Sequence, residues 1–146
     1  MSEEMTWDDK IAYYRSEVKK IRLPQYPTES EVKQKSAQID ELYTSAIFDH
    51  GEAQSEFYKV DNLISRVEAD NKRGNNDDER KANAVRAAQN FRDSEGNLFN
   101  LYGAREKAYE RKVKMEQVIK ALSNKQRLLT LLYGTLKMET DMNRFQ

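Results

Sequence analysis

The residues whose types and spacing could do chemistry are mainly basic, and they gather around one polar stretch. Positive side chains in such a cluster can hold nucleic-acid phosphates, because binding releases the counterions that surround the backbone. An aromatic ring beside them could stack on an unpaired base. The candidate phosphate-binding residues are Arg66, Lys72, Arg73, Arg80, Lys81 and Arg86, and the candidate stacking residues are Tyr58, Phe91, Tyr102 and Tyr109. The alternative interpretation is that these charges solvate an exposed turn.

A second basic group follows further along the chain. Its members are Arg105, Lys107, Arg111, Lys112 and Lys114. They too could meet phosphates. The alternative is that they pair with acids of the preceding helix, for which the candidates are Asp40, Glu41, Glu52 and Glu56.

The chain offers few residues for catalysis or metal binding. His50 is the only histidine and cysteine is absent, which excludes disulfides and thiolate metal sites. No glycine-rich phosphate loop followed by Lys-Ser or Lys-Thr occurs. Residues 70–79 are rich in Asp and Asn, but Lys72 and Gly74 stand where a calcium loop requires ligands. The sequence therefore predicts a protein that is not an enzyme and has no cofactor or metal.

Helical periodicity predicts the elements that must position the basic residues. Apolar residues at steps of three and four over residues 6–22 predict a short amphipathic helix. Pro24 and Pro27 then predict a linker over residues 23–27, because proline lacks the amide donor that a helix needs.

A long helix is predicted over residues 28–71. It begins at a capping box, in which Thr28 and Glu31 can satisfy each other's backbone amides. Apolar residues then recur every seven positions, which is the spacing of packed helices. Gly51 lies within this stripe without changing its phase, so the helix is expected to continue through it.

The helix is expected to fold back at a turn over residues 71–77, which is rich in Asn, Gly and Asp. A return helix is predicted over residues 78–140, with residues 93–97 as its one plausible interruption. The expected fold is all-α: a long antiparallel, coiled-coil-like helical hairpin with a short N-terminal helix, forming a single domain over residues 1–146.

The end of the return helix is apolar on more than one face. The residues concerned are Leu122, Leu128, Leu129, Leu131, Leu132, Tyr133 and Leu136. A helix that is apolar on several sides needs more than one neighbour to cover it. Either the first helix and the proline linker supply all of that cover, or the chain forms a homo-oligomer through this segment.

Charge is polarised along a chain whose net charge is zero. Residues 28–70 contain ten acids and four bases, whereas residues 71–146 contain ten acids and sixteen bases. Such asymmetry permits contact with a polyanion through one part of the chain. No apolar run is long enough to span a membrane, and no export signal is visible, so a cytoplasmic location is expected.

The run from Ile64 to Asn75 resembles the centre of the UvsY-like phage recombination mediators. It carries Arg66 near a helix end, followed by the turn Lys72-Arg73-Gly74. The order of elements over residues 32–138 is similar too, with a long helix, a polar Arg-Gly turn and a return helix ending in an apolar segment. The chain departs from the family pattern in its extra N-terminal helix and its acidic first arm.

The resemblance implies a protein that binds single-stranded DNA and assembles as a ring-like homo-oligomer through its C-terminal helical region. Such proteins help to load a recombinase onto strands held by a single-strand-binding protein, here in the bacterial host cytoplasm if the chain is phage-encoded. The matching positions are Arg66, Lys72 and Arg73, while the three later bases of the cluster are added on charge alone.

Two other classes of protein remain open. A structural or scaffold coiled coil, in phage assembly or as a cytoskeletal adaptor, would explain the helical seam and the apolar end. An acidic helical inhibitor of a host nucleic-acid enzyme would use the acidic face of residues 40–61 as a nucleic-acid mimic.

Overall fold

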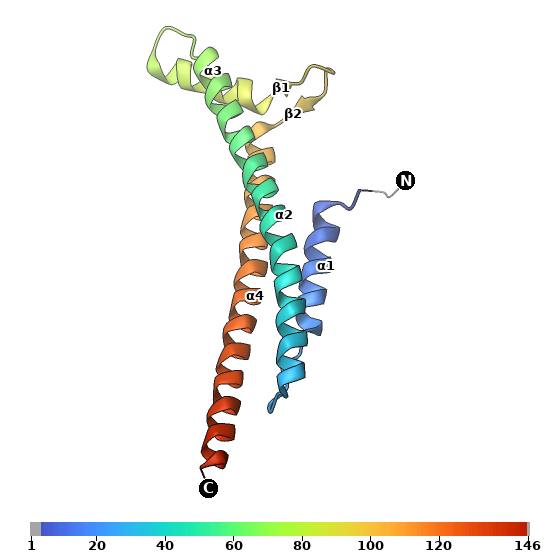
Figure 1. Ribbon diagram of the computed structural model, residues 1–146. Coiled ribbons are helices and arrows are strands. Elements are labelled where there is room, and N and C mark those ends of the chain that lie inside the picture. Colours follow the sequence, from blue (N-terminus) through green and yellow to red (C-terminus); the bar gives the residue numbers. More distant parts are fainter. Residues whose placement is uncertain (1–3, 146) are drawn as a thin grey trace. The chain divides into compact units, whose positions relative to one another are not determined.

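The computed structural model describes residues 4–145 and is built almost entirely from helices (Figure 1). The described elements, in chain order, are α1 (Trp7–Lys20), α2 (Glu29–Asp70), α3 (Asp77–Gln89), β1 (Phe91–Arg92), β2 (Leu98–Phe99) and α4 (Leu101–Arg144). The predominantly helical character expected from the sequence is confirmed. By its internal contacts the chain divides into two compact units, which are described in turn.

Unit 1 comprises the described residues up to His50 and those from Lys114 onward. It holds α1, the first part of α2 and the second part of α4. Helix α1 begins where the Thr6 side chain accepts a hydrogen bond from the backbone amide of Asp9 (3.2 Å), and it ends at Lys20 before the proline linker. The short helix expected over residues 6–22 is therefore present, and Thr6 caps its N-terminus.

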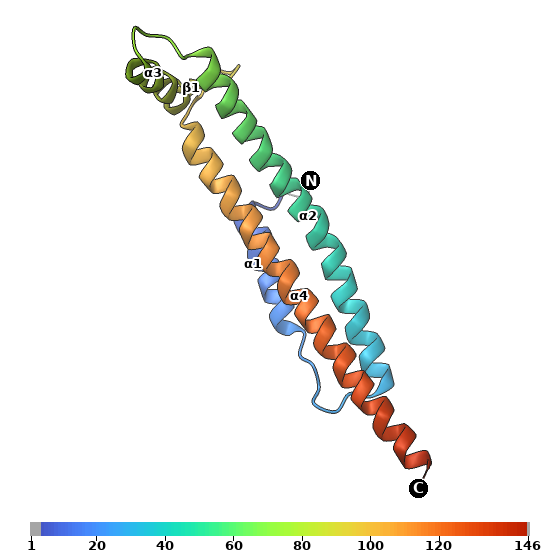
Figure 2. The ribbon, with the colours of Figure 1, turned by 90° about the vertical axis from the view of Figure 1, so that its left-hand side faces the viewer.

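The core of unit 1 lies between these three helices, and α1 runs along both α2 and α4 (Figures 1 and 2). Its buried residues are Ile11, Tyr14, Val18 and Ile21 from α1 and its end, Ile39 and Ala46 from α2, and Met115, Val118, Leu122 and Leu129 from α4. Polar contacts hold the same helices together. The Tyr14 hydroxyl donates to the Asp49 carboxylate, which also pairs with Lys10 (3.5 Å), and Lys125 Nζ donates to the carbonyl oxygen of Ile21 (2.6 Å).

The capping box expected at the start of α2 is present. The Glu31 amide donates to Thr28 Oγ1 (3.1 Å), and the Thr28 amide donates to Glu31 Oε1 (3.3 Å). The helix then runs without interruption through Gly51 to Asp70, as the unbroken apolar stripe predicted.

Unit 2 comprises residues 51–113 and holds the second part of α2, α3, both strands and the first part of α4. Its core is small. Ile64 of α2, Ala88 of α3 and Leu101 of α4 are buried together, with Val60, Leu63, Val67, Phe91 and Tyr102 packed against them.

The prediction of a single return helix over residues 78–140 is wrong. The structure has two helices there, α3 and α4, separated by the two strands between Gln89 and Leu101. The two strands pair antiparallel, with Phe91 opposite Phe99. Asp93 Oδ1 accepts hydrogen bonds from the amides of Glu95 (3.0 Å) and Asn97 (2.8 Å), which offers the backbone a turn in place of a helix.

Two local features complete this interruption. Gly96 has a φ of 83°, a conformation that side chains disfavour. Asn100 then caps α4 by accepting from the amide of Tyr102 (3.1 Å), and α4 continues to Arg144. Within residues 4–145 no helix is both long and apolar enough to cross a membrane.

Candidate functional site

The tip, defined as residues 66–86, contains the six candidate phosphate-binding residues. Its loop is held by specific hydrogen bonds: Arg80 Nε donates to the carbonyl oxygen of Gly74 (3.1 Å), and Asn83 Nδ2 donates to that of Arg73 (2.6 Å). Asn76 caps α3 by accepting from the amide of Glu79 (2.8 Å). The structure therefore gives the tip a defined loop in which Arg80 closes the turn.

All six candidate cations of the tip are exposed. Arg80 also pairs with Asp77 at 3.5 Å, so its charge is partly used within the tip. The other five have no ion pair with any residue in the described range 4–145; they are Arg66, Lys72, Arg73, Lys81 and Arg86. These five are free to meet an external anion.

The tip also contains acids, and they limit where a phosphate could bind. Against the six bases stand five acids in residues 66–86. Three of them lie in the first turn of α3: Asp77, Asp78 and Glu79. Their negative charges interact favourably with the helix dipole and would repel an added anion. A phosphate contact is therefore expected away from that turn.

The four candidate stacking residues separate into two pairs. Phe91 and Tyr102 pack against the core of unit 2, so neither ring is free to receive a base. Tyr58 and Tyr109 are about half exposed, and the Tyr109 ring packs beside Phe57 with centroids 5.7 Å apart. Only Tyr58 and Tyr109 remain available for stacking.

The Tyr102 hydroxyl ties α4 to α2 within unit 2 by donating to Glu68 Oε1 at 2.6 Å. Desolvation raises the pKa of Tyr102 to about 12, and the hydrogen bond and negative charge of Glu68 act in the same direction. Because the folded pKa lies above the ordinary value of 10.0, this contribution to stability is fully present below pH 10 and is lost as the pH rises toward 12.

Tyr102→Phe is expected to lower the free energy of unfolding by about 0.5–1.5 kcal/mol at neutral pH, because it removes one partly buried hydrogen bond. It should also flatten the loss of stability that the wild type shows between pH 10 and 12. Urea unfolding across that range measures both effects, with Tyr58→Phe as the half-exposed control. An unchanged alkaline profile in Tyr102→Phe would contradict the assignment.

Three of the five residues of the second basic group make contacts inside unit 2. Arg105 pairs with Asp61 at 3.2 Å, and Arg111 pairs with Glu56 at 3.8 Å. The Lys112 ammonium lies 5.5 Å from the centre of the Phe57 ring. Pairing with Glu56 was anticipated from the sequence, whereas the partner Asp61 was missed because the order of charges along two helices does not give their relative register.

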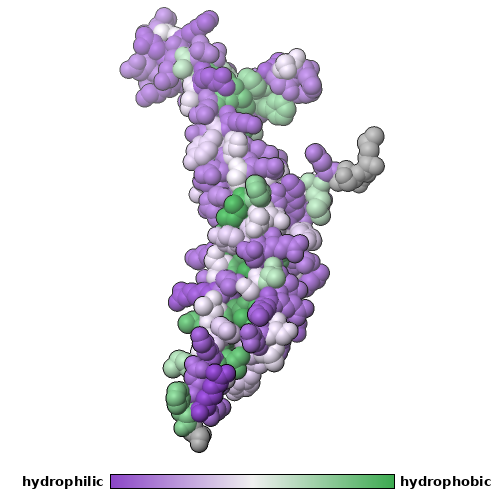
Figure 3. All heavy atoms as spheres, viewed as in Figure 1, coloured by the Kyte–Doolittle hydropathy of each residue, from purple (hydrophilic) through white to green (hydrophobic). Residues whose placement is uncertain are grey.

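A groove in unit 2, here called the hairpin groove, lies between α2, β2 and the first part of α4 and has a volume of about 740 Å³. Its apolar part includes Val60, Leu98 and Phe99, and its charged part includes Lys59, Lys107, Arg111 and Glu56. Figure 3 shows hydrophobic surface at the base of the hairpin, next to its hydrophilic turn. The sequence did not reveal this groove, because it depends on the hairpin that interrupts the expected helix.

The seven apolar residues predicted for self-association do not all lie on the surface. Leu122 and Leu129 belong to the core of unit 1 and are covered by the chain itself, so they offer no surface to a second copy. Leu128, Leu131 and Tyr133 are exposed, and Leu132 and Leu136 are half-buried. Figure 3 shows hydrophobic side chains exposed at this end of α4.

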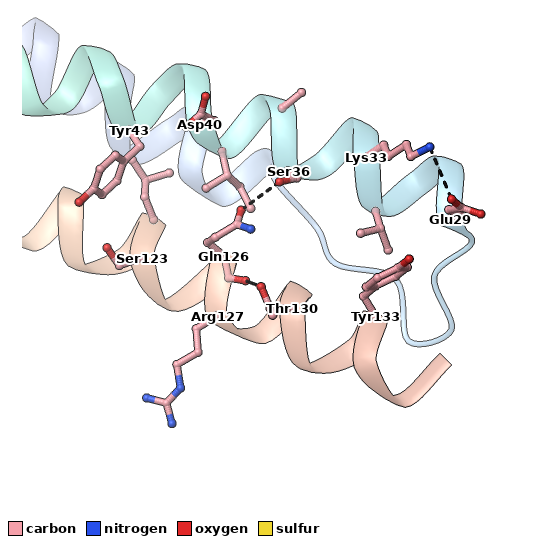
Figure 4. Close-up of a pocket in the computed structure, with 14 residues that line it drawn as sticks. Glu29, Lys33, Ser36, Asp40, Tyr43, Ser123, Gln126, Arg127, Thr130 and Tyr133 are labelled. Carbon is pink, nitrogen blue, oxygen red and sulfur yellow. Dashed lines mark hydrogen bonds and ion pairs between the residues drawn. The ribbon is translucent and has the colours of Figure 1, made fainter. Parts of the chain in front are cut away.

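A second groove lies in unit 1 between the first turns of α2 and the later part of α4, with a volume of about 920 Å³ (Figure 4). Ser36 donates a hydrogen bond to Gln126 across it (3.4 Å). Tyr133 reaches from α4 toward α2, while Arg127 points away. Of the four charged residues in its lining, Glu29 pairs with Lys33 at 3.5 Å and Arg127 points away, so the groove offers packing surface rather than a chemical site.

His50, the only histidine of the chain, makes a contact between two helices. His50 Nε2 lies 3.4 Å from Glu116 Oε1, which is a polar contact between α2 and α4 of unit 1. No group of three or more metal-ligating side chains occurs within residues 4–145.

In comparisons with protein-family models, curated proteins and solved structures, nothing matches the chain.

Proposed function

We propose that the protein binds single-stranded DNA as a homo-oligomer and acts as a recombination mediator. In this role it helps a recombinase to load onto strands covered by a single-strand-binding protein. The observation that carries the proposal is the set of five exposed tip cations without an ion-pair partner in residues 4–145. The resemblance of the run from Ile64 to Asn75 to UvsY-like mediators supplies the particular role.

The tip alone would bind weakly. Its five acids nearly offset its six bases, so one copy offers only a few favourable phosphate contacts. Linking several copies makes each further contact intramolecular and raises the apparent affinity without any new kind of contact. Self-association is therefore part of the proposed mechanism, and the exposed apolar residues at the end of α4 support it.

Lys72→Ala/Arg73→Ala is expected to weaken binding to a single-stranded oligonucleotide and to make it less sensitive to salt. Each lost phosphate contact should reduce the slope of log affinity against log salt by about 0.7. Titrations of a labelled oligonucleotide at several salt concentrations measure the slope. The matched control is Arg15→Ala/Lys19→Ala, which removes one exposed Arg and one exposed Lys from α1. Equal slopes in the wild type and the tip variant would contradict the proposal that the tip contacts DNA phosphates.

A scaffold is the second candidate, and the apolar end of α4 favours it. It requires the same self-association but no nucleic acid. Mass in solution with and without an oligonucleotide separates the two, because only the mediator should form a heavier complex with DNA.

The acidic inhibitor is supported less well than these two. Several acids of the expected mimic face are engaged inside the chain: Asp49 with Lys10, Glu56 with Arg111 and Asp61 with Arg105. A nucleic-acid mimic needs its negative charges to face a basic partner, so these pairs reduce the charge available for that purpose.

A further inference from the structure

The hairpin groove carries an inference beyond the tip. Its apolar side is formed where β2 approaches α2, and it is left uncovered: the side chains of Leu98 and Phe99 are 58% and 44% exposed. Phe99 lies opposite Phe91, which packs into the core of unit 2. Because paired residues of antiparallel strands lie on the same face of a sheet, Phe99 shares the face of Phe91 but remains 44% exposed.

The floor of the groove is formed by small side chains of α4. Gly103, Ala104 and Ala108 line it, and a methyl group added at Gly103 would meet no atom within 4 Å. Such a floor leaves room for a ring to lie beside the exposed Phe99, on which an aromatic group can stack. This geometry fits a planar, aromatic ligand group.

The rim of the groove is positive. Lys107 and Arg111 are four residues apart and so share one face of α4, and Lys59 lines the groove from α2. Neither Lys59 nor Lys107 has an ion pair within residues 4–145, and the one acid in the lining, Glu56, is 3.8 Å from Arg111. Three cations against one carboxylate select an anionic ligand.

We propose that the hairpin groove binds single-stranded nucleic acid. A base would stack on Phe99, while Lys59, Lys107 and Arg111 would hold the flanking phosphates. From Asn100 to Arg111 the groove follows α4 for about 16 Å at 1.5 Å per residue, enough for a short run of nucleotides. The inference rests on the proposed function and adds to it a site that is distinct from the tip residues.

A single strand fits this combination better than a duplex does. Stacking on an aromatic side chain requires an unpaired base, and a rim of cations tracks the phosphates without reading sequence. Binding should therefore tolerate changes of sequence and fall with salt.

The test uses the full chain and fluorescence anisotropy of labelled oligo-dT, with oligo-U as a second arm. Phe99→Leu should weaken binding about tenfold, because it keeps an apolar side chain but removes the stacking ring. Phe99→Tyr should restore binding. Phe48→Leu, the same change at a ring that is 73% exposed and lies outside the groove, should leave binding unchanged. Thermal unfolding of each variant shows that the hairpin remains folded.

The charged rim is tested separately. Lys59→Ala/Lys107→Ala should lower the salt slope by about 1.4, two phosphate contacts in a single strand. Arg15→Ala/Lys19→Ala is again the control. Equal losses on oligo-dT and oligo-U would support a site for single strands of either DNA or RNA, and a loss on one arm only would support a site selective for that nucleic acid.

The outcomes distinguish the groove from the proposed function. If the tip variant loses binding while both groove variants bind like the wild type, the groove inference is overturned and the proposed function stands. If the wild type binds neither oligonucleotide, both are overturned. If the groove variants lose binding of polyglutamate but keep that of oligonucleotides, the groove serves an acidic protein segment and the inference is overturned.

Discussion

Leu122→Ala is expected to lower the free energy of unfolding by about 2–5 kcal/mol. Leu122 is fully buried and is one of the largest side chains in the core of unit 1, where residues of α1, α2 and α4 surround it. Truncation removes apolar contacts and leaves a cavity that three packed helices can close only in part. Because unit 1 has a single core of modest size, this loss is a large share of its stability.

Urea unfolding followed by circular dichroism measures the effect. The control is Phe48→Ala on α2, at a residue that is 73% exposed and lies outside the apolar end of α4, and it should change the free energy by less than about 0.5 kcal/mol. The destabilisation by Leu122→Ala should be independent of protein concentration, because the contacts are made within one chain. A loss that grew on dilution would instead place Leu122 between chains.

The starts of α1 and α2 could be predicted because they depend on neighbouring residues. Thr6 and Asp9, and Thr28 and Glu31, form their hydrogen bonds over three positions, so the pattern of residue types is sufficient. The continuation of α2 through Gly51 was also predictable, since a long apolar stripe outweighs the cost of about 1 kcal/mol for one glycine.

The interruption of the return helix was harder to predict because two signals disagreed. Residues 93–97 contain the Asp, Gly and Asn that form the turn, but apolar residues on either side kept roughly helical spacing. Strands of two residues have no periodicity of their own, and they are stabilised here by the contact of Phe91 with the core of unit 2. Tertiary packing therefore decided an ambiguity that local pattern could not.

The candidate functional residues likewise fall into two groups, those that could be predicted from local sequence and those that depend on packing between elements. Exposure of the tip cations followed from residue type and from the polar turn. The ion pair of Arg105 with Asp61 and the position of Phe99 beside Lys107 depend on the register between elements, which no local pattern specifies. The hairpin groove could have been suspected only from Leu98 and Phe99, two apolar residues directly after a polar turn.

The apolar end of α4 shows how one residue type can serve two purposes. Leu129 faces the other helices of unit 1, and Leu131 lies about 200° around the helix from it, on the opposite face. On that face Leu128, Leu131, Met138 and Met142 recur at steps that are sums of three and four residues, and all four are exposed. We call these four residues the outer stripe.

The outer stripe has the spacing of a helix-packing seam and no cover within residues 4–145, which is why a second copy of the chain is its expected partner. Leu131→Glu/Met138→Glu is expected to reduce the assembly to single chains. Burying each apolar side chain contributes roughly 1.5–3 kcal/mol, and 1.4 kcal/mol is a tenfold change in affinity. Two replacements should therefore weaken association about 100-fold or more.

Sedimentation velocity at several protein concentrations measures the mass of the assembly. Lys137→Glu/Thr140→Glu is the matched control, because it adds two glutamates to exposed positions of the same segment that lie outside the outer stripe. Thermal unfolding of the stripe variant should be close to that of the wild type at low concentration, since these side chains are exposed within one chain. A wild type that sediments as a single chain at every concentration, or a stripe variant that keeps the wild-type mass, would contradict assembly through the outer stripe. Weak tip sites would then have to act singly, and the proposed mediator would lose the multivalency on which its affinity depends.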